Sequence, residues 1–277
     1  MTPLSPVRRA VVTGADLEAL RTWASDVEAW PPGSHRWGHY AEQTATGEAI
    51  CRTENVSACH DGFAGLVRGS LSAVAAAELG VSVADFKDKL NYKQPGGAGF
   101  SPHQDLLAYP GVVRVMSVLL AIDECSATSG CVWIAPGVDE MLPVDHRGVV
   151  VADTAASLPW EPAELAPGDA LCIAGLLPHF SEANRDTRPR RVLVASYAAT
   201  SEGYGRDRYY STRAHAMERA TARDNRFRIS TLADFEGVEV VTANRATAQC
   251  THARPVRTLR ADGRRPDAPA HPPEAQG

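Results

Sequence analysis

The segment VVRVMSVLLAI, residues 112–122, is the strongest β-strand pattern in the chain. It is a short run of β-branched and apolar residues, which is typical of a buried strand. Four further short runs have the same character, and they span residues 131–135, 148–152, 169–174 and 191–197. Turn-forming Gly and Pro residues separate the runs, and no helical pattern alternates with them. We therefore predict an antiparallel β-sandwich or barrel over residues 90–200.

The residues before this region favour helices. The amphipathic pattern of residues 16–24 predicts one helix, and apolar residues at helical spacing predict a second over residues 60–79, ended by Gly80. A third, short helix is expected at residues 82–89. Residues 1–12 are expected to form a loose arm or an edge strand.

The predicted fold is thus mainly β with flanking helices. We expect one domain over residues 1–253, because a chain of 277 residues fits one large domain. Its helical part would span about 13–90, its barrel core about 90–200 and its C-terminal extension about 201–253. Residues 254–277 are dominated by Pro, Arg, Asp and Ala, which indicates a disordered tail.

The composition excludes several classes of partner. Net charge is −5, so no basic field indicates nucleic acid, and no apolar stretch approaches the roughly 18 residues of a membrane helix. The first residues lack the apolar run of a secretory signal, and none of the six cysteines forms a C-x-x-C pair. We expect a cytoplasmic protein with reduced thiols and a small-molecule substrate, and no nucleic-acid or membrane partner. The sequence leaves its oligomeric state open.

The basic residues are unevenly chosen. Of 28 Lys and Arg residues only three are lysines, and Lys87, Lys89 and Lys93 fall within one seven-residue window. A lysine kept in an arginine-rich chain indicates that the lysine is needed there.

One histidine motif points to a metal. Among nine histidines, only His103 is followed two positions later by an acidic residue, Asp105. On an extended segment the two side chains project to the same face and can reach one metal. His179, which follows another strand run, is the best candidate for a third ligand. Two histidines and one carboxylate form the facial triad of non-haem Fe(II) oxygenases, which leaves positions open for a bidentate co-substrate and dioxygen.

An arginine supplies the second half of this pattern. Arg190 lies at the start of the last strand run, after His179. Its planar guanidinium can hold a carboxylate through two parallel hydrogen bonds, as the distal carboxylate of a metal-bound keto acid requires. Arg188 and Arg191 are alternatives, and strand alternation favours Arg190 only if its face points inward.

The ordered motifs resemble those of the phytanoyl-CoA dioxygenase family over about residues 50–213. The matching stretches are KLNYKQPGG (89–97), PHQD (102–105), TSGCVWIAPG (128–137), PGD (167–169), PHFS (178–181), Asn184 and Arg190. The resemblance implies a double-stranded β-helix, a jelly-roll or cupin-like barrel with N-terminal helices. It also implies an enzyme that uses Fe(II), 2-oxoglutarate as co-substrate, and dioxygen.

Carried over residue by residue, the resemblance implies roles for individual side chains. His103, Asp105 and His179 would bind iron, and Arg190 would hold 2-oxoglutarate. Three further residues match family positions near the co-substrate or the triad, namely Lys93, Ser181 and Asn184.

Two positions refine the resemblance. The family's Pro-Gly-Ser-His turn here reads PGVD over residues 136–139, so the turn is kept and its histidine is lost. Related halogenases carry a small residue where this chain has Asp105, so its carboxylate favours oxygen chemistry over halogenation.

The resemblance implies hydroxylation of an unactivated C–H bond. We expect a small metabolite as substrate, in bacterial specialised metabolism such as antibiotic tailoring, because no extended basic surface fits coenzyme A. Epimerisation, desaturation and cyclisation by the same iron chemistry are alternatives. A redox-silent metal-dependent isomerase or hydrolase, and a non-catalytic binding protein, are alternatives from other classes.

Candidate substrate contacts complete the list, and each has a structural alternative. Arg52 either meets substrate or forms a salt bridge, and Trp133 either lines the pocket or packs in the core. Tyr109 and Arg114 belong either to a lid or to a surface turn. Tyr210 covers the barrel mouth or lies in an ordinary loop.

Overall fold

A computed structural model describes residues 6–31, 37–213, 229–230, 232 and 234–240. In chain order its strands and α-helices are β1 (Val7–Arg8), α1 (Gly14–Glu28), β2 (Gly38–Thr44), β3 (Gly47–Glu54), α2 (Asp61–Arg68), α3 (Ser70–Leu79), β4 (Val83–Lys93), β5 (Phe100–His103), β6 (Val115–Ala121), β7 (Val132–Ile134), α4 (Ala152–Ser157), β8 (Glu161–Ala163), β9 (Ala170–Ala174), β10 (His179–Ser181), β11 (Arg190–Ala199) and β12 (Val238–Val240). Short 3-10 helices occupy Val56–Ala58, Asp105–Ala108 and Thr200–Glu202.

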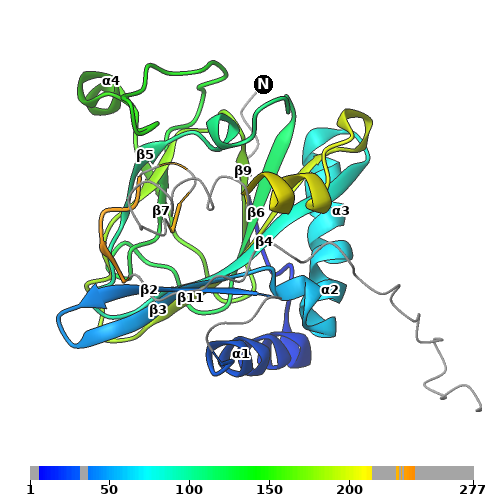
Figure 1. Cartoon of the computed structure of the whole chain (residues 1–277), viewed down its shortest axis with the longest axis vertical. Coiled ribbons are helices and arrows are strands. Elements are labelled where there is room, and N and C mark those ends of the chain that lie inside the picture. The colour runs from blue at the N-terminus through cyan, green and yellow to red at the C-terminus, as the bar shows by residue number, and fades with distance from the viewer. Residues whose placement is uncertain (1–5, 32–36, 214–228, 231, 233, 241–277) are drawn as a thin grey trace, which may run out of the picture.

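The strands form two sheets, and every pairing between them is antiparallel. The large sheet has the order β1-β9-β6-β11-β4-β3-β2-β12, and the small sheet has the order β5-β10-β7-β8. Figure 1 shows β5 and β7 on one side of the large sheet and helices α2 and α3 on the other. The prediction of a mainly antiparallel β fold with flanking helices is confirmed.

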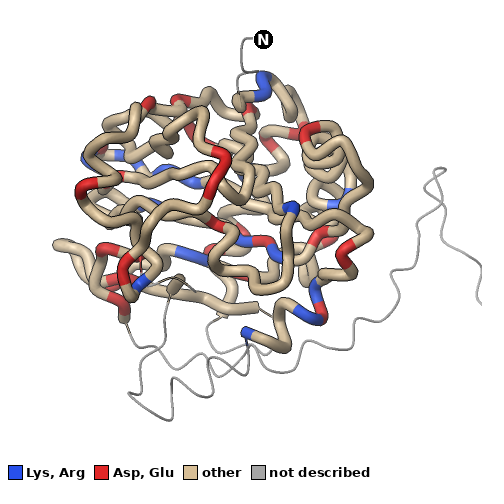
Figure 2. The backbone as a smooth tube through the Cα atoms, turned by 90° about the horizontal axis from the view of Figure 1, so that it is seen from above, with Lys and Arg blue, Asp and Glu red and all other residues tan. Residues whose placement is uncertain are grey.

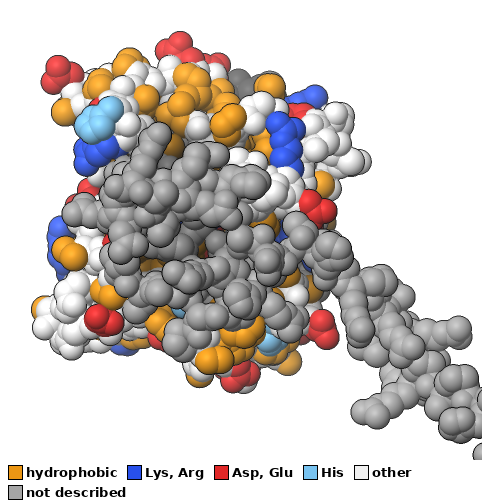
Figure 3. Space-filling model, viewed as in Figure 1, with side chains coloured by type: hydrophobic (Ala, Val, Ile, Leu, Met, Phe, Trp, Pro, Cys, Tyr) orange, Lys and Arg blue, Asp and Glu red, His pale blue; other side chains and the backbone are white. Residues whose placement is uncertain are grey.

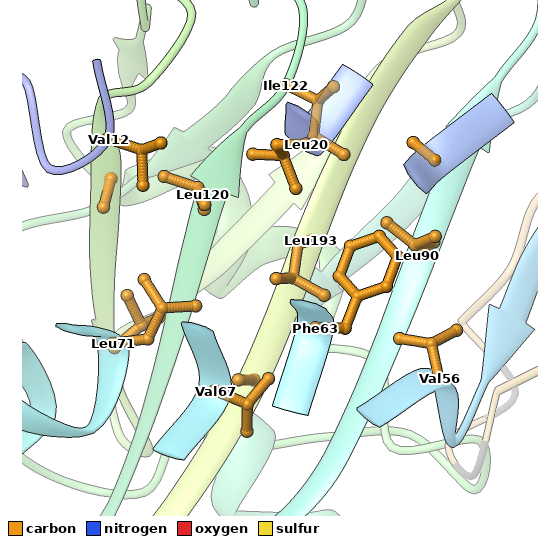
Figure 4. Close-up of a cluster of buried hydrophobic side chains, with 14 of the residues drawn as sticks. Val12, Leu20, Val56, Phe63, Val67, Leu71, Leu90, Leu120, Ile122 and Leu193 are labelled. Carbon is orange, nitrogen blue, oxygen red and sulfur yellow. The ribbon is translucent and has the colours of Figure 1, made fainter. Parts of the chain in front are cut away.

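The main hydrophobic core lies between helices α1–α3 and the outer face of the large sheet. Phe63 and Val67 of α2 and Leu20 of α1 pack there against sheet residues such as Leu193, all of them fully buried (Figure 4). Full burial of one such side chain stabilises the fold by roughly 1.5–3 kcal/mol. This packing fixes one face of the central strands and leaves their other face to the space between the sheets.

The predicted helix over residues 60–79 is two helices. Helix α2 begins after His60, whose side chain accepts a hydrogen bond from the Phe63 backbone N–H, and a break at Gly69 separates it from α3. A Cβ at Gly69 would lie 2.5 Å from the Gly65 carbonyl oxygen, so the chain can turn there only with glycine. Gly80 ends α3 in the left-handed conformation, as predicted.

Two secondary-structure predictions are wrong. Residues 82–89 were expected to be helical, yet they belong largely to strand β4, where pairing with β11 and β3 holds them extended. Residues 148–152 were expected to form a strand, yet only Val150 makes an isolated bridge, with Val144. Gly148 there adopts a positive φ of 82°, and helix α4 begins at Ala152.

The expected helical part, residues 13–90, also contains most of three strands. β2, β3 and β4 lie side by side in the large sheet, so the barrel begins well before residue 90. The weak alternation of residues 38–54 gave no strand prediction over most of this hairpin. Within the expected extension, 201–253, the described part includes β12, which pairs with β2. The predicted tail, 254–277, lies outside the described residues.

The expected N-terminal edge strand is present as β1, which pairs with β9. Asp169 anchors the segment that follows it. Its carboxylate accepts hydrogen bonds from the Ala10 N–H (2.9 Å) and the Ala166 N–H (3.1 Å) and pairs with Arg9 at 2.5 Å. Although burial opposes the shift, these contacts lower the pKa of Asp169. The turn beside it needs Gly168, where a Cβ would lie 2.0 Å from the Val12 carbonyl oxygen.

The outer surface carries no single dominant charge on the face seen in Figure 3, where hydrophobic, acidic and basic side chains are mixed. Within the described residues, no helix combines the length and the apolar character that a membrane crossing requires.

Candidate active site

Two histidines from different strands lie against each other in the small sheet. His103 ends β5 and His179 begins β10, and the two are cross-strand partners with ring centroids 4.2 Å apart. Asp105 follows at the start of the 3-10 helix Asp105–Ala108. Its Oδ1 lies 3.9 Å from His103 Nε2 and 4.0 Å from His179 Nε2. Antiparallel pairing thus brings the three predicted metal ligands together.

The residue between the first two candidates holds the loop in place. Gln104 is fully buried, and its amide donates to the carbonyl oxygens of Glu140 (2.8 Å) and Leu176 while its oxygen accepts from the Leu142 N–H (2.9 Å). Because Gln104 points away from the cavity, its neighbours His103 and Asp105 point into it.

The protonation pattern of the histidines fits a metal. His103 Nδ1 lies 2.7 Å from the Ser101 carbonyl oxygen, and His179 Nδ1 lies 2.9 Å from that of Leu177. A carbonyl oxygen only accepts hydrogen bonds, so in the neutral form of each ring Nδ1 carries the proton and Nε2 offers a lone pair. One donor atom from each of the three residues lies within 4.8 Å of the others. Two imidazoles and a carboxylate in this arrangement suit Fe(II).

The charges around the triad favour the metal-binding forms of its members. Burial and the nearby His103 lower the pKa of His179 to about 4, so its ring is neutral at neutral pH. Burial raises the pKa of Asp105, but the two histidines, Lys89 and Lys87 outweigh it and hold the pKa below its usual range. Asp105 Oδ2 also accepts a hydrogen bond from Ser117 Oγ at 2.9 Å. The carboxylate is therefore ionised and oriented.

Arg190 and Lys93 form a second cluster in the same cavity. They are cross-strand partners at the end of the β4–β11 pair, and both are buried. Both donate to the Gly130 carbonyl oxygen, Lys93 at 3.4 Å, and Lys93 Nζ also donates to Ser181 Oγ at 2.9 Å and to the Glu182 carbonyl oxygen. Arg190 Nε is buried and has no hydrogen-bond partner among the described residues. Burial and Arg190 lower the pKa of Lys93 well below its usual value, so an anion placed here would relieve their repulsion.

The geometry distinguishes Arg190 from its neighbours. Arg191 lies on the opposite face of β11 and pairs with Asp123 at 2.8 Å, while the Arg188 side chain is 73% exposed. Arg190 and Val194 line the cavity, so the face that strand alternation assigned to Arg190 points inward. Of these three arginines, only Arg190 meets the condition that the sequence set.

Asn184 has a supporting position instead of a place in the cavity lining. Its side-chain amide donates to the carbonyl oxygens of Lys93 (2.8 Å) and Arg188 (2.9 Å), and its oxygen accepts from the Asp186 N–H (2.8 Å). It ties the turn before β11 to the end of β4, and so holds Lys93 beside Arg190.

The five candidate substrate contacts fall into two groups. Arg52 and Tyr109 line the cavity, which has a volume of about 1010 Å³ with its open mouth included. Arg114 is exposed, Trp133 stacks on Phe180 at an interplanar angle of 12°, and Tyr210 packs against Arg206, 5.3 Å from its ring centroid. None of these last three lines the cavity.

Sequence reasoning missed several residues of the site. Lys87, Lys89 and Asn91 line the cavity in a row along β4 that Lys93 ends. Figure 2 marks the Lys, Arg, Asp and Glu positions along the backbone. The grouping of the lysines was the available signal, but the expected helix hid their common face. Asp234 was also missed; its Oδ2 lies 3.2 Å from His103 Nδ1.

Comparisons with known proteins identify the family of the chain. The family model for phytanoyl-CoA dioxygenase matches residues 6–192. The chain is 34% identical over 227 residues to methylphosphonate hydroxylase from Gimesia maris, covering 80% of this chain and 87% of that protein. It is 34% identical over 198 residues to 2-aminoethylphosphonate dioxygenase from an uncultured bacterium, covering 69% and 76%.

The fold also matches a solved structure. The crystal structure of EctD from S. alaskensis with 2-oxoglutarate and 5-hydroxyectoine superposes with a TM-score of 0.60 at 19% identity, covering 73% of this chain and 79% of that one. This likeness confirms the predicted double-stranded β-helix.

Proposed function

This chain belongs to the phytanoyl-CoA dioxygenase family, and on that premise we propose that it hydroxylates a C–H bond of a small organophosphonate. The enzyme is a dioxygenase that depends on Fe(II) and 2-oxoglutarate. The observation that carries the proposal is one cavity that contains the triad, the Arg190–Lys93 pair and further cationic side chains. The names of the two phosphonate-oxidising relatives give the substrate class.

The proposed reaction converts substrate, dioxygen and 2-oxoglutarate into hydroxylated substrate, succinate and CO2. Iron with its co-substrate supplies the oxidising power, which no side chain of the protein provides. In this proposal His103, Asp105 and His179 hold the metal. The His179 ring is already neutral at neutral pH, so metal binding needs no proton release from it.

The co-substrate would lie between the metal and the Arg190–Lys93 pair. Arg190 would hold its distal carboxylate, since its Nε and part of its guanidinium are uncommitted within the described structure. Lys93 and Ser181, already hydrogen-bonded to each other, would add a second cation and a hydroxyl. Asn184 would act as a positioning residue through the Lys93 backbone.

The cavity walls position the substrate and limit its contact with water. Leu119, Val194 and Ile173 of the large sheet and Ile229 and Phe235 of the C-terminal segment contribute apolar side chains to the lining. Holding a C–H bond in one orientation close to the metal is the main contribution that such walls make.

Product analysis tests this function. Purified protein is incubated in air with Fe(II), 2-oxoglutarate and either methylphosphonate, ethylphosphonate or the matching carboxylate, acetate or propionate. We expect succinate and a hydroxylated phosphonate, detected by mass spectrometry and 31P NMR, with the phosphonate preferred over its carboxylate counterpart. Hydroxylation of the carboxylates alone, or coupled turnover with none of the phosphonates, would refute the substrate class.

A further inference from the structure

We infer that Lys89, Asn91 and Arg52 form an anion-binding subsite that receives the phosphonate group of the substrate, separate from the subsite for 2-oxoglutarate. The inference deepens the proposed function and rests on it. The three residues form a block across two neighbouring strands, because Arg52 of β3 is the cross-strand partner of Asn91, and Lys89 is next on the same face of β4.

Each residue of this block keeps one N–H donor group that has no hydrogen-bond partner among the described residues. Asn91 Oδ1 accepts a hydrogen bond from Arg52 Nε at 3.1 Å, which turns the Asn91 NH2 group toward other partners. Arg52 Nη1 donates to the Ile229 carbonyl oxygen and lies 3.8 Å from Glu54 Oε1. Nη2 is therefore the Arg52 nitrogen that has no partner among the described residues. The Lys89 ammonium forms no hydrogen bond or ion pair with a described residue. Three N–H donor groups thus line one part of the cavity.

Glu54, an acidic neighbour of the block, is shared with a cation outside it. Glu54, the cross-strand partner of Lys89, lies 3.0 Å from Arg213, so its charge is shared with that residue. Burial, together with the charges of Arg52 and Lys87, lowers the pKa of Lys89 well below its usual value. An anion bound among these groups would offset their mutual repulsion.

The charge balance of the whole cavity points the same way. Its described lining contains five cationic side chains and three acidic ones, namely Arg52, Lys87, Lys89, Lys93 and Arg190 against Glu42, Asp105 and Asp234. A bound Fe(II) and a 2-oxoglutarate dianion cancel each other's charges. With every one of these side chains ionised, two positive charges remain, and a phosphonate dianion matches them.

The register places this block beside the proposed metal site. Lys87 lies next to Lys89 on the same face of β4 and is the cross-strand partner of Ser196 in β11. Ser196 is in turn the partner of Ser117 in β6. Ser117 hydrogen-bonds to Asp105, whereas Lys93 lies four residues, roughly 13 Å, further along β4 from Lys89. Lys89 and Lys93 are thus two separate cations on one face of β4, with Asn91 between them, and we assign one cation to each anion.

Direct binding measurements test the subsite without relying on turnover. The anaerobic complex of protein, Fe(II) and 2-oxoglutarate is titrated with methylphosphonate by isothermal titration calorimetry. We expect Lys89→Met to weaken methylphosphonate binding by about 10- to 100-fold, the loss of a charge-assisted hydrogen bond. Asn91→Asp keeps the acceptor for Arg52 but replaces the NH2 donor by an anionic oxygen, and should weaken binding at least as much.

Controls separate this subsite from the co-substrate site. Arg147→Met removes a cation from an exposed position and should leave methylphosphonate affinity unchanged. The 2-oxoglutarate affinity, measured before phosphonate is added, should stay near the wild-type value in both subsite variants. Wild-type methylphosphonate affinity in both folded variants, or an equal loss of 2-oxoglutarate affinity, would overturn the inference.

Inorganic phosphate as a second probe distinguishes the two proposals. Phosphate binding that is lost in Lys89→Met, in a protein that hydroxylates no phosphonate, would support the anion subsite and refute the proposed function. If the protein hydroxylates phosphonates, but neither Lys89→Met nor Asn91→Asp weakens phosphonate binding, the proposed function is supported and the subsite is refuted.

Discussion

Replacing Arg190 with alanine should weaken 2-oxoglutarate binding while sparing the metal. The side chain is 4% exposed, donates one hydrogen bond to Gly130, and keeps a buried Nε without a partner among the described residues. It can therefore add charge-assisted hydrogen bonds to a carboxylate, worth about 1.5–3 kcal/mol. At about 1.4 kcal/mol per factor of ten, the expected loss is roughly 10- to 140-fold in affinity.

The lower part of this range is the better expectation, because the substitution also removes a like charge beside Lys93. The assay is an anaerobic titration of the Fe(II)-loaded protein with 2-oxoglutarate, followed by the visible charge-transfer band of the chelate. Fe(II) affinity is measured separately and should stay close to that of the wild type, since Arg190 contacts none of the three proposed ligands.

Arg191→Ala provides a matched control. It removes the adjacent arginine, which lies on the outer face and pairs with Asp123, so 2-oxoglutarate affinity should not change. If Arg190→Ala binds 2-oxoglutarate as well as the wild type, while Arg188→Ala or Arg191→Ala binds it poorly, the assignment of strand faces is refuted.

Three further substitutions test the site and the fold. His179→Ala should lower Fe(II) affinity more than about 100-fold, because the loss of a residue that only hydrogen-bonds to a metal ligand already costs up to about 100-fold. The control His146→Ala removes an exposed histidine and should leave Fe(II) affinity unchanged. Equal Fe(II) affinities of the two variants would exclude His179 as a ligand. Asp169→Asn should cost about 1–3 kcal/mol of unfolding free energy at pH 7. The folded-state pKa of Asp169 is lowered, so the stability that its carboxylate contributes is lost as the pH falls below its unfolded-state pKa of about 3.9. In urea titrations, the difference in unfolding free energy between wild type and Asp169→Asn should therefore shrink at low pH. A difference that grows on acidification would contradict this prediction. Leu193→Ala should lower the unfolding free energy by about 2.7–5 kcal/mol, because Leu193 is fully buried in the core. Val238→Ala, at an exposed position, should lower it by less than about 0.5 kcal/mol. Similar urea midpoints for the two variants would contradict the described core.

The sequence predicted the elements whose patterns are local. The apolar runs that became β6 and β11 are buried on both faces, so their composition alone identified them. The triad could be proposed because its residue types restrict the chemistry, although only the β5–β10 pairing shows that His103 and His179 meet.

The errors have physical causes. In β4 the charged side chains of Lys87 and Lys89 face a polar cavity, so the strand lacks the apolar inner face that strand prediction looks for. The run Val149–Val151 has strand composition, but no long neighbouring strand pairs with it. Pairing over long sequence distances decides both cases, and local pattern does not contain that information.

Strand β4 has a consequence for how this enzyme can diverge. Its residues Lys87, Lys89, Asn91 and Lys93 face the cavity, while Leu90 and Tyr92 on the other face belong to the core beneath the helices. Inserting or deleting one residue would exchange the two faces and destroy core and cavity together. Exchanging single side chains along this strand can therefore change the substrate preference and preserve the fold, whereas a change of one residue in its length would disrupt both.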